Sequence, residues 1–331
     1  MQINPKISHF TSKQIIWWIK TIIFLITLYS IYLLIRQKEV NIQSIGQSFD
    51  LILLSKNTLL LVVVLLLMPI NWAFEALKWQ KLASKVENIT FLEAYKGVLV
   101  GLAFATATPM MLGDFAGKIL MLKSDKRLQS IGAILLGNAI QLYVSLLFGT
   151  ISYLFFIFWS KPTPIFLHLG IISCLIFALI IGLLLSFNLN RIDGFSTQNK
   201  VFQYVLKYLN ILKYYNIIAL RNAFFIASAR YLIFMIQFLF ILKIFEINLP
   251  ITVLLAGIGI IFLAKTLGST LNFLGDLSVR QLTSVYYFSY FGVNISLVVS
   301  ATLVIWLINV LLPILVGSLF ILQLKFTTKK T

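Results

Sequence analysis

The sequence predicts an all-α polytopic membrane protein, with about six spanning helices and two re-entrant helical hairpins that form an inverted repeat. Three observations predict this fold. Of the 331 residues, 60% are hydrophobic and only 11% are charged, which leaves too little polar surface to coat soluble domains. Long apolar runs recur along the chain, and two of them are interrupted by Gly, Thr, Pro and Asp. Lysine and arginine collect in a few connecting segments, which gives the spans a direction.

Each membrane span needs roughly 20 mostly apolar residues. The first candidate follows Lys6 and Lys13 as a signal peptide would, but its apolar part is long and no small-residue cleavage pattern follows, so we expect a retained helix. Two further apolar stretches, 91–122 and 251–290, contain the interruptions, and eight full spans are the alternative to two hairpins. The six spans are expected at 16–35, 58–77, 130–158, 165–187, 222–244 and 296–322.

The distribution of basic residues predicts which loops are cytoplasmic. The stretch 91–123 then starts and finishes in the cytoplasm, whereas 251–290 starts and finishes outside, so each must turn back inside the bilayer. Both termini are expected in the cytoplasm, with the protein in the bacterial inner membrane. Five basic segments support this topology: Lys6 and Lys13; Lys78, Lys81 and Lys85; Lys118, Lys123, Lys126 and Arg127; the loop 191–221; and the tail with Lys325, Lys329 and Lys330.

The formal net charge of +17 could suit nucleic acid or an anionic membrane surface; the apolar setting of the charges favours the membrane, so we expect no nucleic-acid partner. Cys174 is the only cysteine, so neither an intramolecular disulfide nor a cysteine-based metal site is available. His9 and His168 are the only histidines and lie far apart in sequence. We therefore expect no metal site, no cofactor and no catalytic histidine.

An acid–base motif occurs once in each interrupted stretch. The first stretch contains Leu-Gly-Asp-Phe-Ala-Gly-Lys at 112–118, and the second contains Leu-Gly-Asp-Leu-Ser-Val-Arg at 274–280. These are the only two Gly-Asp pairs in the chain, and a break rich in small and hydroxyl residues precedes each. We interpret them as an inverted repeat, which would place a binding site near the bilayer midplane, where the two broken helices meet.

The motif has a structural interpretation and a functional one. Asp114 and Asp276 are placed where they would cap a half-helix, and the base four residues later would pair with each on the same face. That would make a self-contained structural device. In the functional interpretation the bases Lys118 and Arg280 point into a cavity and hold a phosphate.

Two further charges fall at membrane depth, where they are costly and usually face a pathway or a partner: Arg230 and Lys265. Four cations against the two aspartates leave two surplus positive charges, which an anionic ligand would satisfy. The alternative is that Arg230 and Lys265 snorkel or pair with Glu75. Glu75 is itself expected at the membrane interface, because Trp72, Lys78 and Trp79 around it look like interfacial belt residues. The candidate substrate-binding residues are Lys118, Arg280, Arg230, Lys265, Asp114, Asp276, Gly113, Gly275, Thr108, Pro109 and Asn272.

The chain is expected to form a single membrane domain, 1–331, in two halves. The first repeat half covers 58–158 and the second 222–322. Between them, 188–221 turns polar with interleaved aromatic and lysine residues, which predicts an amphipathic linker helix on the cytoplasmic leaflet that contacts anionic lipid head groups.

At the same motifs the chain resembles the flippase-like family, that is, the membrane region of lysylphosphatidylglycerol synthases and its stand-alone relatives. Residues 108–118 are similar to the first family motif, a Thr-Pro followed by Gly, an acid and then an arginine, whose place Lys118 takes. Residues 275–281 are similar to the second motif, Gly-x-Leu-Gly-Val-Arg-Glu, with Ser278 in place of a glycine and Gln281 in place of the glutamate. The missing glutamate argues against a mechanism that needs a carboxylate there.

The resemblance implies translocation of a lipid with a charged or glycosylated head group, a membrane phospholipid or a lipid-linked saccharide. Nine residues follow the last expected span, which leaves no room for the aminoacyl-transferase domain of the synthases, so we expect a transporter rather than an enzyme. Two alternatives stay open. One is a membrane glycosyltransferase with a polyprenyl-phosphate donor, for which Glu39 and Asp50 offer thin evidence; the other is an ion-coupled transporter of small anions.

Overall fold

The computed structural model describes residues 58–106, 108, 112–124, 127–160, 164–189, 206, 208–268 and 273–323, and the regular structure in these ranges is entirely helical. The expected first span at 16–35, half of the linker (190–205 and 207) and the basic tail lie outside the described residues. The helices are α3 (Thr58–Ala83), α4 (Phe91–Thr106), α5 (Gly113–Leu120), α6 (Ser130–Ser160), α7 (Ile165–Phe187), α9 (Ile217–Ile244), α10 (Ile251–Gly268), α11 (Phe273–Tyr290), α12 (Ile295–Trp306) and α13 (Leu312–Gln323).

Within the described residues, six helices are long and apolar enough to cross a membrane. Five of them coincide with expected spans. The sixth, Ile251–Gly268, was expected to be one arm of a hairpin. The protein is therefore an all-helical, multi-pass membrane protein. The six are Leu59–Ala83, Arg127–Ser160, Ile165–Phe187, Ile217–Ile244, Ile251–Gly268 and Ile295–Leu322.

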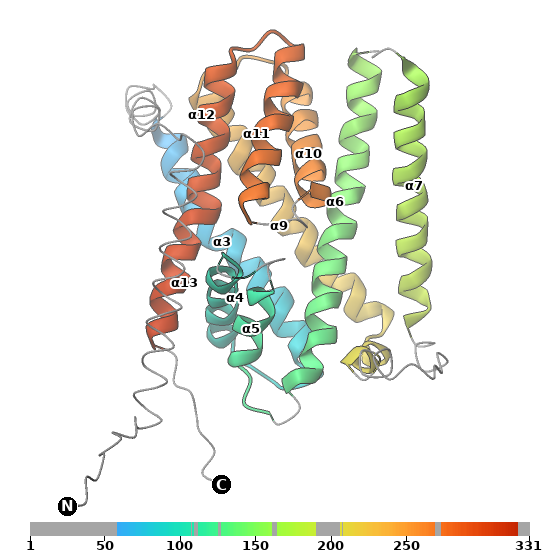
Figure 1. Ribbon diagram of the computed structural model, residues 1–331, viewed down its shortest axis with the longest axis vertical. Coiled ribbons are helices and arrows are strands. Elements are labelled where there is room, and N and C mark those ends of the chain that lie inside the picture. The colour runs from blue at the N-terminus through green and yellow to red at the C-terminus, as the bar shows by residue number, and fades with distance from the viewer. Residues whose placement is uncertain are drawn as a thin grey trace, which may run out of the picture.

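Two pairs of shorter helices occupy opposite halves of the molecule (Figure 1). Helices α4 and α5 pack together in the lower half, whereas α10 and α11 pack together in the upper half. Helices α3, α6, α9 and the α12–α13 run pass between the two levels. The ends that contain the two Gly-Asp motifs thus approach each other near mid-height.

The contacts between the halves are reciprocal. Helix α3, the first described helix of one half, packs against α9, the first of the other. Helix α4 of the lower pair packs against α13, and α10 of the upper pair packs against α6. Each short pair is therefore held by a helix of the opposite half, α13 for the lower pair and α6 for the upper pair.

Glycine allows the closest of these approaches. A Cβ atom at Gly113 would meet the backbone of Phe104, and one at Gly117 would meet the backbone of Gly101. Helices α4 and α5 can therefore pack backbone to backbone only with glycine at these positions.

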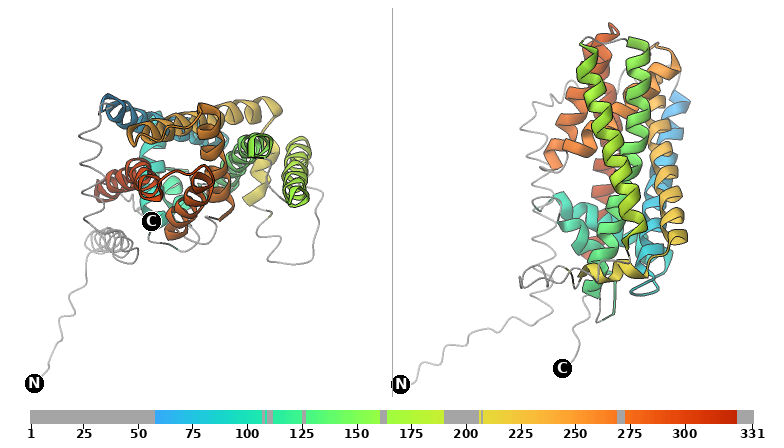
Figure 2. Two further views of the ribbon diagram at one scale, coloured as in Figure 1. Left: turned by 90° about the horizontal axis from the view of Figure 1, so that it is seen from above. Right: turned by 90° about the vertical axis from the view of Figure 1, so that its right-hand side faces the viewer.

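Helix α7 stands at the edge of the bundle and packs mainly against α6 (Figure 2). Its exposed residues are almost all apolar, as expected for a helix that faces lipid.

The described part of the linker between the two halves packs against α3 and α6. Tyr215 is buried and its hydroxyl donates to the carbonyl of Leu82, while Ile211 fits against Gly132 of α6.

Candidate functional site

A cavity of about 490 Å³ lies where the two short helix pairs and the long helices meet. Its wall is formed by residues of α3, α4, α5, α6, α9, α10, α11 and the helical turn after α12. The six charged residues that the sequence singled out all line it. They are Asp114, Lys118, Arg230, Lys265, Asp276 and Arg280.

The first ion cluster is centred on Glu75 of α3. Its carboxylate lies 2.8 Å from Lys78 Nζ, 3.0 Å from Arg230 Nη1 and 3.6 Å from Lys118 Nζ. Lys118 in turn pairs with Asp114, one helical turn earlier, at 2.9 Å. This confirms the expected pairing of acid and base four residues apart.

A second cluster lies on the other helix pair. Arg280 Nε donates to Asp276 Oδ2 at 3.1 Å, and Lys265 Nζ lies 3.7 Å from Asp276 Oδ1. The Arg280 guanidinium lies over the rings of Phe234 and Phe262, at 5.1 and 5.9 Å from their centroids. The side chain is almost fully buried. An arginine is suited to this position because a guanidinium can stack on aromatic faces while its N–H groups hydrogen-bond.

Both clusters carry surplus positive charge. In the first, Lys78, Lys118 and Arg230 face Glu75 and Asp114; in the second, Lys265 and Arg280 face Asp276. Each cluster therefore has a formal charge of +1. Together the clusters carry the two surplus positive charges that the sequence predicted, but they also include Glu75 and Lys78, which were not in that count.

The expectation that Glu75 is interfacial is wrong. Glu75 is 6% exposed and Lys78 is 2% exposed, and the neighbouring Trp72 and Trp79 are buried rather than belt residues. The physical reason is that the carboxylate gathers three cations, which makes burial of the whole group tolerable. Lys78 and Lys118 consequently do not belong to cytoplasmic loops. Of the described residues in those two basic segments, Lys81, Lys85, Lys123 and Arg127 are exposed.

The capping role expected of the aspartates is also corrected. The carboxylate of Asp114 makes no cap to α5; instead Thr108 Oγ1 accepts the N–H of Gly113 at 2.7 Å and donates to the carbonyl of Phe104. Asp276 lies in the first turn of α11, which begins at Phe273, and pairs with Arg280. Thr108 thus closes the start of the short helix and does not line the cavity.

The remaining expected site residues are placed as follows. Gly113 is buried at the start of α5, against α4. Gly275 lies in the first turn of α11. Pro109 and Asn272 lie outside the described residues.

Three cavity groups were not among the candidate site residues named from the sequence. Glu75 is the centre of a cluster, and the Trp72 ring lies under the Arg230 guanidinium at 4.9 Å. Gln141 accepts from both Lys78 and Arg230 at 3.3 Å. The signal available for Glu75 was its position: it is one of only ten acids and falls near the end of an apolar run. The alternative that Arg230 pairs with Glu75 is confirmed, whereas Lys265 pairs with Asp276.

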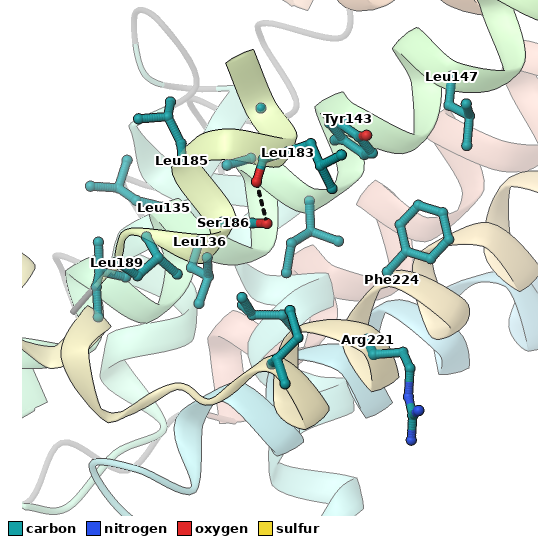
Figure 3. A pocket seen from close by; sticks show the side chains of 16 residues that line it. Leu135, Leu136, Tyr143, Leu147, Leu183, Leu185, Ser186, Leu189, Arg221 and Phe224 are labelled. Atoms are coloured by element: carbon teal, nitrogen blue, oxygen red, sulfur yellow. Dashed lines mark hydrogen bonds between the residues drawn. The ribbon is translucent and has the colours of Figure 1, made fainter. Parts of the chain in front are cut away.

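A second hollow, of about 630 Å³, lies between α6, α7 and α9 and is almost wholly apolar (Figure 3). Leucine side chains from α6 and α7 point into it, and Arg221, its single charged lining residue, extends away from them. Its lining is apolar apart from a few residues such as Arg221, so the central cavity with its two ion clusters is the better candidate for a polar ligand.

Fold and site together define a polytopic membrane protein with a buried, positively charged cavity between two pairs of short helices. The family model described as the lysylphosphatidylglycerol synthase transmembrane region matches residues 17–317, and the chain belongs to that family. No curated protein and no solved structure shows a significant match to the chain.

Proposed function

We propose that the protein translocates a lipid with a charged or glycosylated head group across the bacterial inner membrane, with the head group bound in the central cavity. The observation that carries this proposal is the meeting of two ion clusters, each with a formal charge of +1, on the walls of one cavity. Buried surplus charge is costly, and an anionic head group would offset it. The acyl chains would remain in the lipid outside the bundle.

The two short helix pairs are proposed to be re-entrant hairpins of an inverted repeat. Their location in opposite halves of the molecule and the reciprocal contacts α4–α13 and α10–α6 support this interpretation. Re-entrant segments are tolerated at membrane depth where they are buried in protein or line a polar cavity. Rocking of one half against the other would then expose the cavity to each side in turn, with both termini in the cytoplasm.

The ion clusters suggest how a head group would be held. Lys118 and Arg280 each pair with an aspartate on their own helix, which fixes the side chain before the ligand arrives. A lysine offers a compact charge and an arginine a planar fork, and both bind phosphate oxygens. The proposed ligand therefore bridges the lower and upper helix pairs through Lys118 and Arg280, with Arg230 and Lys265 beside them.

The test is movement of a fluorescent anionic phospholipid in proteoliposomes by wild type and by the double variant Lys118→Gln, Arg280→Gln. We expect the double variant to lose translocation while it remains folded by circular dichroism and size-exclusion chromatography. The matched control is Lys81→Gln, Arg127→Gln, which removes two exposed cations and should translocate as the wild type does. Wild-type rates in the cavity variant would exclude the proposed site.

The same proteoliposomes separate the alternatives. Transfer of sugar from a labelled polyprenyl-phosphate donor would favour a glycosyltransferase. Uptake of a water-soluble anion without lipid movement would favour an ion-coupled anion transporter.

A further inference from the structure

Asn309 lines the cavity and carries an amide without a hydrogen-bond partner among the described residues. It lines the cavity wall and is 3% exposed, yet neither its Nδ2 nor its Oδ1 has a hydrogen-bond partner among the described residues. Leaving a buried polar group unpaired destabilises a protein, because the group loses its hydrogen bonds to water and gains none in return. A leucine would fill a similar volume without that cost, so the amide is not explained by packing.

A local irregularity in the helix positions this residue. Residues Leu307–Leu311 form a π-helical turn between α12 and α13, in which the N–H of Leu312 donates to the carbonyl of Leu307, five residues earlier. Such turns are rare and often occur at functional sites. Pro313 has no N–H to donate to the carbonyl of Asn309, and that carbonyl accepts Trp72 Nε1–H at 3.2 Å.

A second unpaired donor is independent of Asn309. Arg280 uses Nε to hold Asp276, but its Nη1 is buried without a hydrogen-bond partner among the described residues. Arg280 and Asn309 line the same cavity from different helices. The cavity therefore offers a charged donor and, separately, a neutral group that both donates and accepts.

We propose that Asn309 is a specificity-determining residue: it recognises a neutral hydrogen-bonding group, a hydroxyl or an amide, that the ligand head group carries beside its phosphate. The inference rests on the proposed function, because it takes the cavity to be the head-group site. It goes further by assigning the two halves of the head group to different residues. The phosphate is bound by the cations, and the neutral group by the amide of Asn309.

Interhelical hydrogen bonding is the competing role for a buried amide, and Gln237 illustrates it. Gln237 is fully buried and its Nε2 donates to the carbonyl of Val64 on α3 at 2.9 Å. The side chain of Asn309 makes no such bond to a described residue. The two amides can therefore be compared directly: Gln237 joins two helices through its Nε2, whereas Asn309 lines the cavity with both amide atoms unpaired among the described residues.

The experiment compares two lipids of equal charge in binding to the purified full-length protein, measured by native mass spectrometry. Phosphatidylglycerol carries head-group hydroxyls, whereas phosphatidylethanol with the same acyl chains carries none. We expect the wild type to prefer phosphatidylglycerol roughly five- to tenfold, the effect of one hydrogen bond. Asn309→Leu should remove the preference without lowering the melting temperature, and Asn309→Ala provides a smaller replacement if leucine disturbs folding. Gln237→Leu should lower the melting temperature and keep the preference.

Equal binding of both lipids by the wild type, or binding of neither, would overturn the inference, as would a preference that survives in both Asn309 variants. Translocation of the same lipids is measured in parallel. A preference that depends on Asn309 without any lipid movement would uphold the recognition role and contradict translocation.

Discussion

Arg230 Nη1 lies 3.0 Å from Glu75 Oε2, and this ion pair joins α9 to α3, the first described helices of the two halves. The guanidinium also covers the Trp72 ring and donates to Gln141 of α6. Three helices are thus linked at one buried point on the cavity wall. When one half moves against the other, the interactions of Arg230 with Glu75, Trp72 and Gln141 must either move together as a unit or break.

Replacing Glu75 with Gln should destabilise the protein. The change leaves Lys78, Lys118 and Arg230 with Asp114 as the remaining carboxylate of the cluster. Breaking a buried ion pair costs about 3–5 kcal/mol in soluble proteins, so we expect a clearly lower melting temperature in detergent. Addition of phosphatidylglycerol should restore part of the loss, because its phosphate supplies the missing negative charge.

Glu246→Gln serves as the control for this measurement, since Glu246 is exposed at the end of α9. An unchanged melting temperature in Glu75→Gln would contradict the central role of the cluster. If anionic and zwitterionic lipids raise the melting temperature of Glu75→Gln equally, the lipid phosphate does not supply the negative charge that Glu75 has lost.

The local part of the site could be predicted from sequence, whereas its long-range part could not. Asp114 with Lys118 and Asp276 with Arg280 are four residues apart, and helical geometry alone places them in contact. Glu75 meets Arg230 because α3 and α9 pack together, and since no spacing reveals such a contact, the sequence could offer this pair only as an alternative. Tryptophans beside Glu75 suggested a membrane interface, but tertiary burial of the ion cluster overrode that local signal.

Gly117→Ala should separate α4 from α5. The new Cβ atom would meet the backbone of Gly101, which cannot move aside as a flexible side chain can. Overpacking of this kind costs about 1–3 kcal/mol, and a shift of α5 would also displace Lys118. We expect a lower melting temperature and weaker phosphatidylglycerol binding.

Gly170→Ala is the matched substitution, because a Cβ atom there has no neighbour within 4 Å among the described residues. It lies in α7 and should leave both measurements close to the wild type. If Gly117→Ala lowers the melting temperature and phosphatidylglycerol binding no more than Gly170→Ala does, neither stability nor binding depends on the close backbone contact between α4 and α5.

Glu93 should make the start of α4 sensitive to acid. Its carboxylate accepts the backbone N–H and the hydroxyl of Thr90, each at 2.9 Å, and pairs with Lys123 at 3.1 Å. The hydrogen bond from the Thr90 backbone, followed by the bond from Lys123, lowers the pKa of Glu93 below its ordinary value of 4.5. A lowered pKa means that the charged form stabilises the folded state above pH 4.5 and that this contribution fades as the pH falls through the lower folded value.

The corresponding measurement is the difference in melting temperature between wild type and Glu93→Ala from pH 7 downward. The difference should be largest at neutral pH and shrink below about pH 4.5. Glu246→Ala, at an exposed carboxylate, should show no comparable trend. A difference for Glu93→Ala that stays constant over the whole range would contradict the assigned role.

Cysteine labelling should test the topology on which the proposed mechanism depends. In a Cys174→Ser background, single cysteines at Lys85 and Arg127 flank the α4–α5 pair, and cysteines at Asn248 and Ile295 flank the α10–α11 pair; all four positions are exposed. If both pairs are re-entrant hairpins, Lys85 and Arg127 label from one side of the membrane, and Asn248 and Ile295 label from the other. The charge distribution predicts that the first side is the cytoplasm, so a membrane-impermeant maleimide added to intact cells should reach only Asn248 and Ile295. If instead the two positions that flank either pair label from opposite sides, that pair crosses the membrane an odd number of times, and the proposed meeting of two hairpins at the cavity is excluded.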